Sequence, residues 1–431
     1  MSQQRDGTTV TGPWRPPGSP EIRVIDVDAH LHEPLDWVEQ TEPALAEALG
    51  PPLRFMDVAN TVFGISNPTL AVLPELQQPT GGYDTILPGF VQHLEITDTR
   101  QPEQQSATNG DPFCGSEARL AFCDERGIDV QFLNPTFLVG AFVQASRAKR
   151  FDLMPKIRQC WNQWATDQVQ GHTDRLIPVT QIDLSDLRWS IAEMTRMRER
   201  GSRAFAIPES PVGAPRFASN GQPALAKSLT HPDFEPLWSA AVDLGMAAIA
   251  HVGFSRERIN PGWANNGADD LMTYSFLNMV VSPQTAPQLL LAALAFDGVF
   301  ERHPKLTVIV EEVGVSWLPH LLDVLDHGVG RGSWGTLNDS EYRPDFAGSA
   351  YTLPLSPSEY LRRQVRVTPL VATQLLHPTI DSAPEMLCFS SDYPHVEGTG
   401  DAKTVCDRQL QDVSEVVRRA FYGGVGDMLG L

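Results

Sequence analysis

Two short motifs near the ends of the chain carry side chains that can bind a divalent metal ion. Asp28 and His30 stand two residues apart after an apolar run, and Asp392 and His395 stand three apart near the C-terminus. Side chains two residues apart on a strand share a face, so Asp28 and His30 can point at one ion. His32 joins them only if the strand continues that far. Carboxylates and imidazoles also transfer protons in enzymes, so the motifs predict metal-assisted chemistry.

Eight short apolar runs of strand character, separated by helical sequence, must position these residues. The first begins at Val24, and the others span 128–133, 176–182, 203–207, 246–250, 306–310, 364–367 and 386–390. Strands that alternate with helices are typical of parallel βαβ units. Eight units with polar residues after nearly every strand predict an α/β fold, a distorted (β/α)8 TIM barrel with a long insertion after its first strand. The site is expected at the carboxyl ends of the strands.

The ends of three later strands supply further candidate ligands. His251 follows the fifth run, Glu312 the sixth and Asp392 the eighth. Together with Asp28 and His30 they make five candidate metal ligands. Oxygen and nitrogen donors of this mix suit Zn²⁺, Mn²⁺ or Fe²⁺, and no cysteine is placed to join them.

Two adjacent glutamates end the sixth run, and neighbouring residues of a strand point to opposite faces. We therefore expect Glu312 to enter the barrel, and Glu311 to lie in solvent or to cap the following helix. Each candidate taken alone also has an ordinary structural explanation, such as a helix cap or a buried histidine. The prediction of a metal site therefore depends on their convergence. The candidates for moving protons are Asp392, Glu312 and His395.

Composition and charge exclude several classes of function. The chain has 431 residues, with 53 acidic and 33 basic residues and a net charge of −20. Such a field repels phosphate backbones and anionic membranes, so we expect neither nucleic-acid nor membrane binding. Five scattered cysteines without a Cys-x-x-Cys pair favour reduced thiols and a cytoplasmic location. Residues 1–20 are polar and rich in Gly, Pro and Thr, which predicts a disordered tail before a barrel over 21–431.

The long connections of the barrel are expected to select the substrate. Residues 35–115 leave from the ligand-bearing end of the first strand and are interpreted as a cap or lid. His32 and Glu33 are expected to support the ligands or the fold. The residues expected to bind an apolar, aromatic or carboxylate-bearing substrate are Arg256, Arg258, Trp263 and Tyr274.

Five sequence motifs are similar to those of a known enzyme family. They are Asp-Val-Asp-Ala-His-Leu-His-Glu-Pro (26–34), His-Pro-Asp-Phe-Glu-Pro-Leu-Trp (231–238), Gly-Val-Phe-Glu-Arg-His-Pro-Lys-Leu (298–306), Val-Gly-Val-Ser-Trp-Leu-Pro (313–319) and Ser-Ser-Asp-Tyr-Pro-His (390–395). Through them the chain resembles the amidohydrolase-related family of the amidohydrolase superfamily. By position, the resemblance implies the metal ligands Asp28, His30, His251 and Asp392. In many members a histidine or glutamate stands at the Asp28 position and a histidine at the Glu312 position, so the acid or base of the reaction stays open.

The resemblance implies a metal-dependent hydrolase or carboxy-lyase, assembled as a dimer or larger homo-oligomer. We expect a metal-activated water to hydrolyse an ester-type bond, or a small apolar or aromatic carboxylic acid to lose CO₂, with Zn²⁺ or Mn²⁺ as cofactor. One branch of the family contains a non-heme diiron monooxygenase. Oxidation of a bulky, terpenoid-like substrate in secondary metabolism is therefore an alternative, with Glu33 and His395 helping to hold a second iron. A catalytically inactive binding barrel is a third hypothesis.

Overall fold

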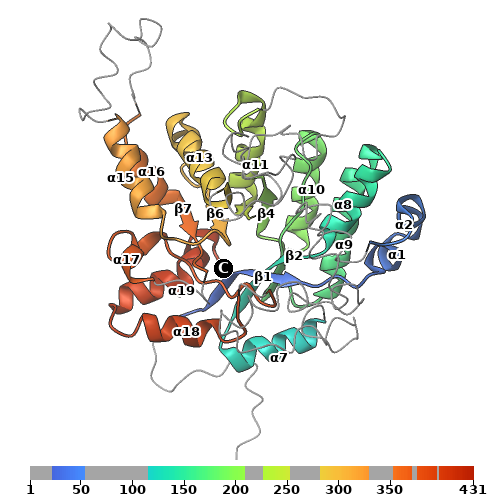
Figure 1. Ribbon diagram of the computed structural model, residues 1–431, viewed down its shortest axis with the longest axis horizontal. Helices are drawn as coiled ribbons and strands as arrows, with labels where there is room; N and C mark the ends of the chain where they lie inside the picture. The colour runs from blue at the N-terminus through green and yellow to red at the C-terminus, as the bar shows by residue number, and fades with distance from the viewer. Residues whose placement is uncertain are drawn as a thin grey trace, which may run out of the picture.

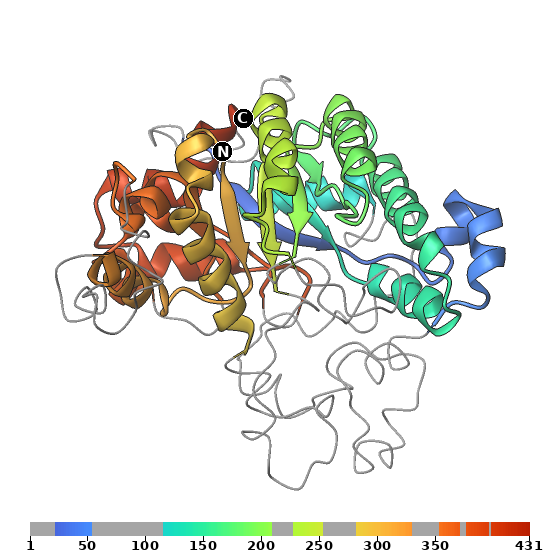
Figure 2. The ribbon, with the colours of Figure 1, turned by 90° about the horizontal axis from the view of Figure 1, so that it is seen from above.

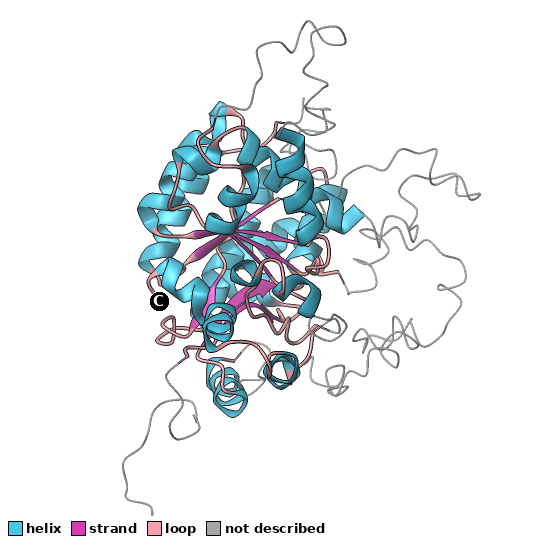
Figure 3. Cartoon of the chain, turned by 90° about the vertical axis from the view of Figure 1, so that its left-hand side faces the viewer, coloured by secondary structure: helices cyan, strands magenta, loops and turns pink. Residues whose placement is uncertain are grey.

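The computed structural model describes residues 22–53, 115–208, 227–252, 282–329, 353–370, 376–395 and 398–431. Figures 1 and 3 show strands at the centre of the molecule and helices around them. Within these stretches, no helix combines the length and the apolar character needed to span a bilayer.

Parallel strands form the wall of the barrel. They are β1 (Ile25–Leu31), β2 (Val130–Pro135), β3 (Leu176–Pro178), β4 (Ala204–Ile207), β5 (Ala247–His251), β6 (Val308–Glu311) and β7 (Val365–Val367). They pair in chain order, as a sheet β1-β2-β3 and a sheet β4-β5-β6-β7. Each observed strand overlaps one of the runs predicted from the sequence.

Three isolated bridges join the two sheets into a ring: Thr180–Phe205, Val367–Leu387 and Ala29–Tyr393. The segment 387–393 thereby occupies the eighth position, between β7 and β1. A backbone hydrogen bond from Asp392 N to Asp28 O (2.8 Å) also ties it to β1. The α/β fold with eight parallel wall segments is confirmed, although the last of them pairs too irregularly to form a regular strand.

Apolar side chains from alternate strand positions fill the barrel interior. The members of this inner cluster on the wall are Ile25, Val27, Val130, Phe132, Ile177, Val179, Ala204, Ala247, Ile249, Ile309 and Cys388. Val425 and Leu429 of α19 (Glu415–Leu429) join it near the start of β1. Gly426 permits this approach, because a Cβ there would lie 2.4 Å from Ile25 Cδ1. The end of the barrel opposite the predicted site is therefore filled by apolar side chains of the strands and of α19.

A register shift in β1 brings its polar residues to the inner face. Ile25 and Val27 belong to the inner cluster, so simple alternation would turn Asp28 and His30 outward. The pairing of β1 with β2 is irregular between Asp26 and Ala29. An irregularity of this kind reverses which residues face inward beyond it. It explains how apolar and metal-binding side chains of one strand share the barrel interior.

Helices cover the outside of the strand ring. They are α7 (Ser116–Arg126), α8 (Leu138–Arg147), α9 (Met154–Gln168), α10 (Leu187–Glu199), α11 (Glu235–Leu244), α13 (Ser282–Phe296), α14 (Val299–Arg302), α15 (Leu318–Val329), α16 (Pro357–Gln364), α17 (His377–Ile380), α18 (Ala402–Gln409) and α19. A larger buried apolar cluster lies between them and the strands. Helix α11 ends at Gly245, which adopts φ 60°, a left-handed conformation that favours glycine.

The insertion after the first strand begins with two short helices, α1 (Trp37–Thr41) and α2 (Pro43–Leu49). They contact α9 and α8, and Figure 2 shows them on the flank of the barrel. Residues 54–114, which make up most of the expected lid, and the expected tail 1–20 lie outside the described residues.

Candidate metal centre

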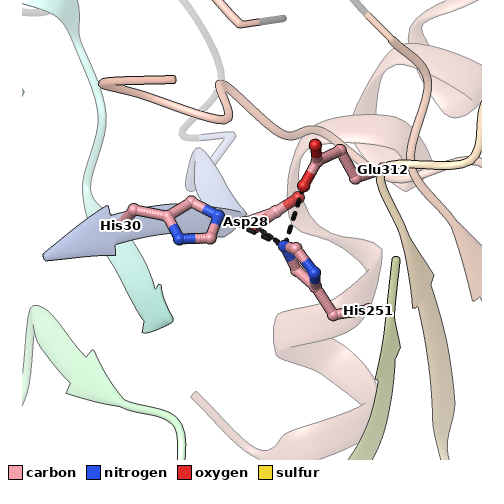
Figure 4. Close-up of side chains that lie close together, drawn as sticks. All are labelled: Asp28, His30, His251 and Glu312. Atoms are coloured by element: carbon pink, nitrogen blue, oxygen red, sulfur yellow. Dashed lines mark hydrogen bonds and ion pairs between the residues drawn. The ribbon is translucent and has the colours of Figure 1, made fainter. Parts of the chain in front are cut away.

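Four side chains at the rim of the barrel converge on one point (Figure 4). Asp28 and His30 come from β1, His251 ends β5, and Glu312 follows β6. One ligand atom of each lies within 4.8 Å of the ligand atoms of the others. The carboxyl ends of parallel strands meet at one rim, so residues far apart in the sequence become neighbours there.

The two imidazoles direct lone pairs at each other. His30 Nδ1 lies 3.1 Å from the Pro135 carbonyl oxygen, and His251 Nδ1 lies 2.6 Å from that of Val252. A carbonyl oxygen only accepts, so both Nδ1 atoms carry a proton and donate it. In the neutral rings both Nε2 atoms are therefore bare. They lie 3.2 Å apart, and each also faces Asp28 Oδ1, at 3.3 and 3.6 Å. Only a cation or an additional proton can satisfy these lone pairs.

Burial and charge at this point fit a divalent cation. Burial alone would raise the pKa of Asp28, but His251 and His30 hold it well below its ordinary value. Burial would lower the pKa of His251, but Asp28 and Glu312 hold it well above its ordinary value. Among the described residues, no donor reaches the buried Asp28 Oδ2. Two imidazole nitrogens among carboxylate oxygens form a donor set that Zn²⁺ and Mn²⁺ accept.

Asp392 and His395 lie directly beside this group. With His30 and Glu312 they form a second, overlapping set of ligand atoms within 4.8 Å of one another. Asp392 Oδ1 is 3.5 Å from His30 Nε2 and 3.1 Å from His395 Nδ1, while His395 Nε2 is 3.1 Å from Thr136 Oγ1. His395 Nδ1 thus faces the Asp392 carboxylate, and its Nε2 shares a hydrogen bond with the Thr136 hydroxyl. Burial lowers the pKa of His395 well below its ordinary value, which agrees with a neutral ring.

Glu312 and Asp392 share an unusual backbone conformation, with φ of 59° and 53°. Left-handed φ in a residue other than glycine costs on the order of 1–3 kcal/mol and persists only where the surroundings hold it. Glu312 lies just past β6 and Asp392 lies near the end of the eighth wall segment, and in both places the conformation ends the alternation of the strand. Both carboxylates thereby reach the rim.

The prediction that Glu311 lies in solvent or caps a helix is wrong. Glu311 is fully buried, and it lies two residues beyond Ile309 of the inner cluster, on the same face of β6. Its Oε2 accepts a hydrogen bond from Asn134 Nδ2 at 3.0 Å. Burial, followed by the charge of Asp28, raises the pKa of Glu311 well above its ordinary value. Both adjacent glutamates enter the barrel because the positive φ of Glu312 overrides alternation.

His32 and Glu33 are buried but belong to neither group of ligand atoms. Glu33 Oε2 accepts the backbone N–H groups of Thr136 (3.2 Å) and Phe137 (2.7 Å), and Oε1 accepts the indole N–H of Trp161 (2.5 Å). His32 packs against the Phe137 ring, with centroids 5.1 Å apart. Glu33 thus fixes the turn after β2 that carries Thr136.

Two residues that contact the predicted ligands, Asn134 and Thr136, had no role in the sequence prediction. Both are polar residues just past the end of the predicted strand 128–133. Polar residues in that position of a barrel are candidates for the functional site, so the sequence did contain a signal for them. The predicted substrate-binding residues lie outside the described stretches: Arg256, Arg258, Trp263 and Tyr274.

Comparison with solved structures supports the fold. An amidohydrolase from Mycobacterium avium subsp. paratuberculosis K-10 is 21% identical, with a TM-score of 0.65 over 96% of this chain and 100% of that chain. A 2,6-dihydroxybenzoate decarboxylase from Rhizobium is 15% identical, with a TM-score of 0.58 over 95% and 99%. A manganese-bound 5-carboxyvanillate decarboxylase from Novosphingobium aromaticivorans DSM 12444 is 18% identical, with a TM-score of 0.55 over 95% and 96%.

Comparison of the sequence with family models identifies the family of the chain. No curated protein matches its sequence. The family model described as Amidohydrolase matches residues 25–424, from the start of β1 into α19. That match includes every strand and every rim residue described above. The chain therefore belongs to the amidohydrolase family of metal-dependent enzymes.

Proposed function

We propose that this enzyme hydrolyses or decarboxylates a small carboxylic acid or ester-type substrate with the help of one divalent cation. The observation that carries the proposal is the pair of imidazole Nε2 atoms 3.2 Å apart, with carboxylate oxygens around them. The residues that would hold the cation are Asp28, His30, His251 and Glu312.

Proton transfer is assigned to Asp392, which lies beside these ligands. A bound divalent cation would lower the pKa of a coordinated water and polarise a facing carbonyl or carboxylate. In hydrolysis Asp392 takes the proton of the attacking water. In decarboxylation it would first take a proton from water and would deliver that proton to the carbon that keeps the electron pair of the broken C–C bond as CO₂ leaves. His395 faces Asp392 and would help to keep the carboxylate turned toward the rim, while the Thr136 hydroxyl makes a hydrogen bond with the other ring nitrogen of His395.

Aromatic carboxylic acids are the first substrates to test. Solved structures with this fold include decarboxylases named for 2,6-dihydroxybenzoate and 5-carboxyvanillate. A substrate carboxylate is a suitable ligand for a cation that keeps an open position. Arg256 and Arg258 remain the proposed partners of a second anionic group, and Trp263 and Tyr274 the proposed partners of an aromatic ring.

The test combines metal analysis with two activity assays. The protein as purified is analysed for metal content, then depleted with a chelator and reloaded with Mn²⁺ or Zn²⁺. Release of CO₂ from hydroxybenzoates and hydrolysis of aryl esters and lactones are measured for each form. We expect one ion per chain and a turnover that disappears on depletion and returns on reloading.

Two other results would replace the proposal. Two irons per chain with oxygen-dependent turnover would identify the diiron oxygenase alternative. Absence of bound metal, with a melting temperature that added metal does not change, would identify an inactive binding barrel, because a tightly bound ion stabilises the folded state.

A further inference from the structure

Asn134 connects two buried carboxylates inside the barrel. It lies near the end of β2 and is 3% exposed. Its Nδ2 is 3.0 Å from Asp28 Oδ1 and 3.0 Å from Glu311 Oε2. A side-chain amide carries two N–H groups, so one can serve each carboxylate.

The oxygen of Asp28 that Asn134 contacts is also the oxygen that faces the imidazoles. Asp28 Oδ1 lies 3.3 Å from His30 Nε2 and 3.6 Å from His251 Nε2. The other oxygen, Oδ2, receives no hydrogen bond from any residue in the described stretches. The amide of Asn134 is thus a donor that can keep Oδ1 turned toward the cation.

Glu311 determines which way the Asn134 amide points. Both groups that face the Nδ2 end of the amide offer a carboxyl oxygen, and a carboxyl accepts a hydrogen bond through such an oxygen whether it is ionised or neutral. If the amide rotated by half a turn, its carbonyl oxygen would meet Asp28 Oδ1 and Glu311 Oε2, and both contacts would be lost. Glu311 is fully buried, and its register partner on β5 is His251, so the rim elements themselves hold it in place.

We propose that Asn134 and Glu311 are positioning residues that aim Asp28 at the bound cation. The inference rests on the proposed metal site. Hydrogen bonds that orient a metal ligand typically change metal affinity by about 10- to 100-fold when removed. Neither residue touches the cation, so their effect should appear in the dissociation constant of the metal before any substrate is added.

The same strand offers a matched control. Gln131, three residues before Asn134 on β2, is fully buried and donates from Nε2 to Asp26 Oδ2 at 2.8 Å. Asp26 belongs to neither group of ligand atoms. The substitution Gln131→Leu therefore removes one buried amide–carboxylate bond of the kind that Asn134→Leu removes twice, at a carboxylate outside both groups of ligand atoms.

The experiment measures the dissociation constants of Mn²⁺ and Zn²⁺ by competition with a chromophoric chelator, and the melting temperature of the metal-free proteins. We expect Asn134→Leu and Glu311→Leu to weaken metal binding by about 10- to 100-fold. The metal dissociation constant of Gln131→Leu should lie within about twofold of the wild-type value, although its melting temperature should be lowered about as much as that of Asn134→Leu. Glu311→Gln keeps an acceptor for Asn134, so its metal dissociation constant should also lie within about twofold of the wild-type value. If Asn134→Leu does not fold, Asn134→Ser removes both bonds with a smaller side chain.

The outcomes separate the inference from the proposed function. If the wild type binds metal tightly and Asn134→Leu binds it no more weakly than Gln131→Leu, the positioning role is wrong and the metal site stands. If Glu311→Gln binds as weakly as Glu311→Leu, orientation of the amide by an acceptor is wrong. A wild-type protein that binds neither ion overturns the proposed function, and the inference with it.

Discussion

Replacing Glu33 by glutamine tests how the turn after β2 is held against the site. The Glu33 carboxylate accepts three N–H groups, two from the backbone of Thr136 and Phe137 and one from the Trp161 indole. Glutamine keeps one oxygen and replaces the other with an NH₂ group. Even in its better orientation, which keeps both backbone bonds, it leaves the indole N–H facing a donor. An unsatisfied buried donor costs about 1–3 kcal/mol, so in hydrogen bonding alone the variant is less stable than the ionised wild type by about that amount.

The pH dependence of this loss is the more specific part of the prediction. Burial raises the pKa of the Glu33 carboxyl from 4.5 to about 7, and its three donors lower it only in part. A pKa that is higher in the folded state means that the folded protein holds the proton more firmly. The resulting stabilisation is complete below about pH 4.5 and is lost as the pH rises to about 7. The rise in the Glu33 pKa from 4.5 to about 7 corresponds to about 3 kcal/mol in the free energy of unfolding.

The assay is urea unfolding of the wild type and Glu33→Gln between pH 4.5 and 8. The free energy of unfolding of the wild type, measured relative to that of the variant, should fall by about 3 kcal/mol across this range, because glutamine does not titrate. Other titrating groups are common to both proteins and cancel in the difference. A constant difference at all pH values would refute the reasoning and would mean that the three donors keep Glu33 ionised throughout.

Three further predictions concern the site itself. Asp392→Asn should lower turnover by about 10²- to 10⁴-fold while its circular dichroism spectrum stays that of the wild type, and unchanged turnover would remove Asp392 from proton transfer. Thr136→Val removes the hydroxyl 3.1 Å from His395 Nε2, so kcat should fall by up to about tenfold with KM little changed; a change confined to KM would argue for substrate contact instead. Chelation should lower the melting temperature, since an ion present at about 100 times its dissociation constant contributes about 2.7 kcal/mol, and differential scanning calorimetry with and without chelator measures the shift.

The strands and the rim could be predicted because their signals are local. Each strand is a short apolar run followed by a polar residue, and runs that alternate with helices close into a parallel barrel. In that architecture all strand ends reach the same rim, so His251 and Asp392 could be placed near Asp28 without knowledge of any contact. The positions of Arg256 and the other predicted substrate-binding residues remain predictions.

Alternation along a strand was a poor guide wherever the backbone departs from regular geometry. The irregular pairing of β1 turns Asp28 inward after Val27, and the left-handed φ of Glu312 brings it to the rim although Glu311 already points into the barrel. A shift of one residue reverses the face of every later side chain. Alternation from Ile309 does place Glu311 in the interior, and it is the position of Glu312 at the rim that no periodicity in the sequence could have assigned.

The sequence by itself determined the parallel barrel and the residue types that gather at its rim, because hydrophobic periodicity and strand-end polarity act over a few residues. Only the tertiary structure decided which atoms meet. Asn134 lies 106 positions from Asp28 and 177 from Glu311, yet one amide group reaches both carboxylates. Such contacts depend on the closure of the whole ring, on one irregular strand pairing and on two left-handed residues, and these are properties of the folded chain.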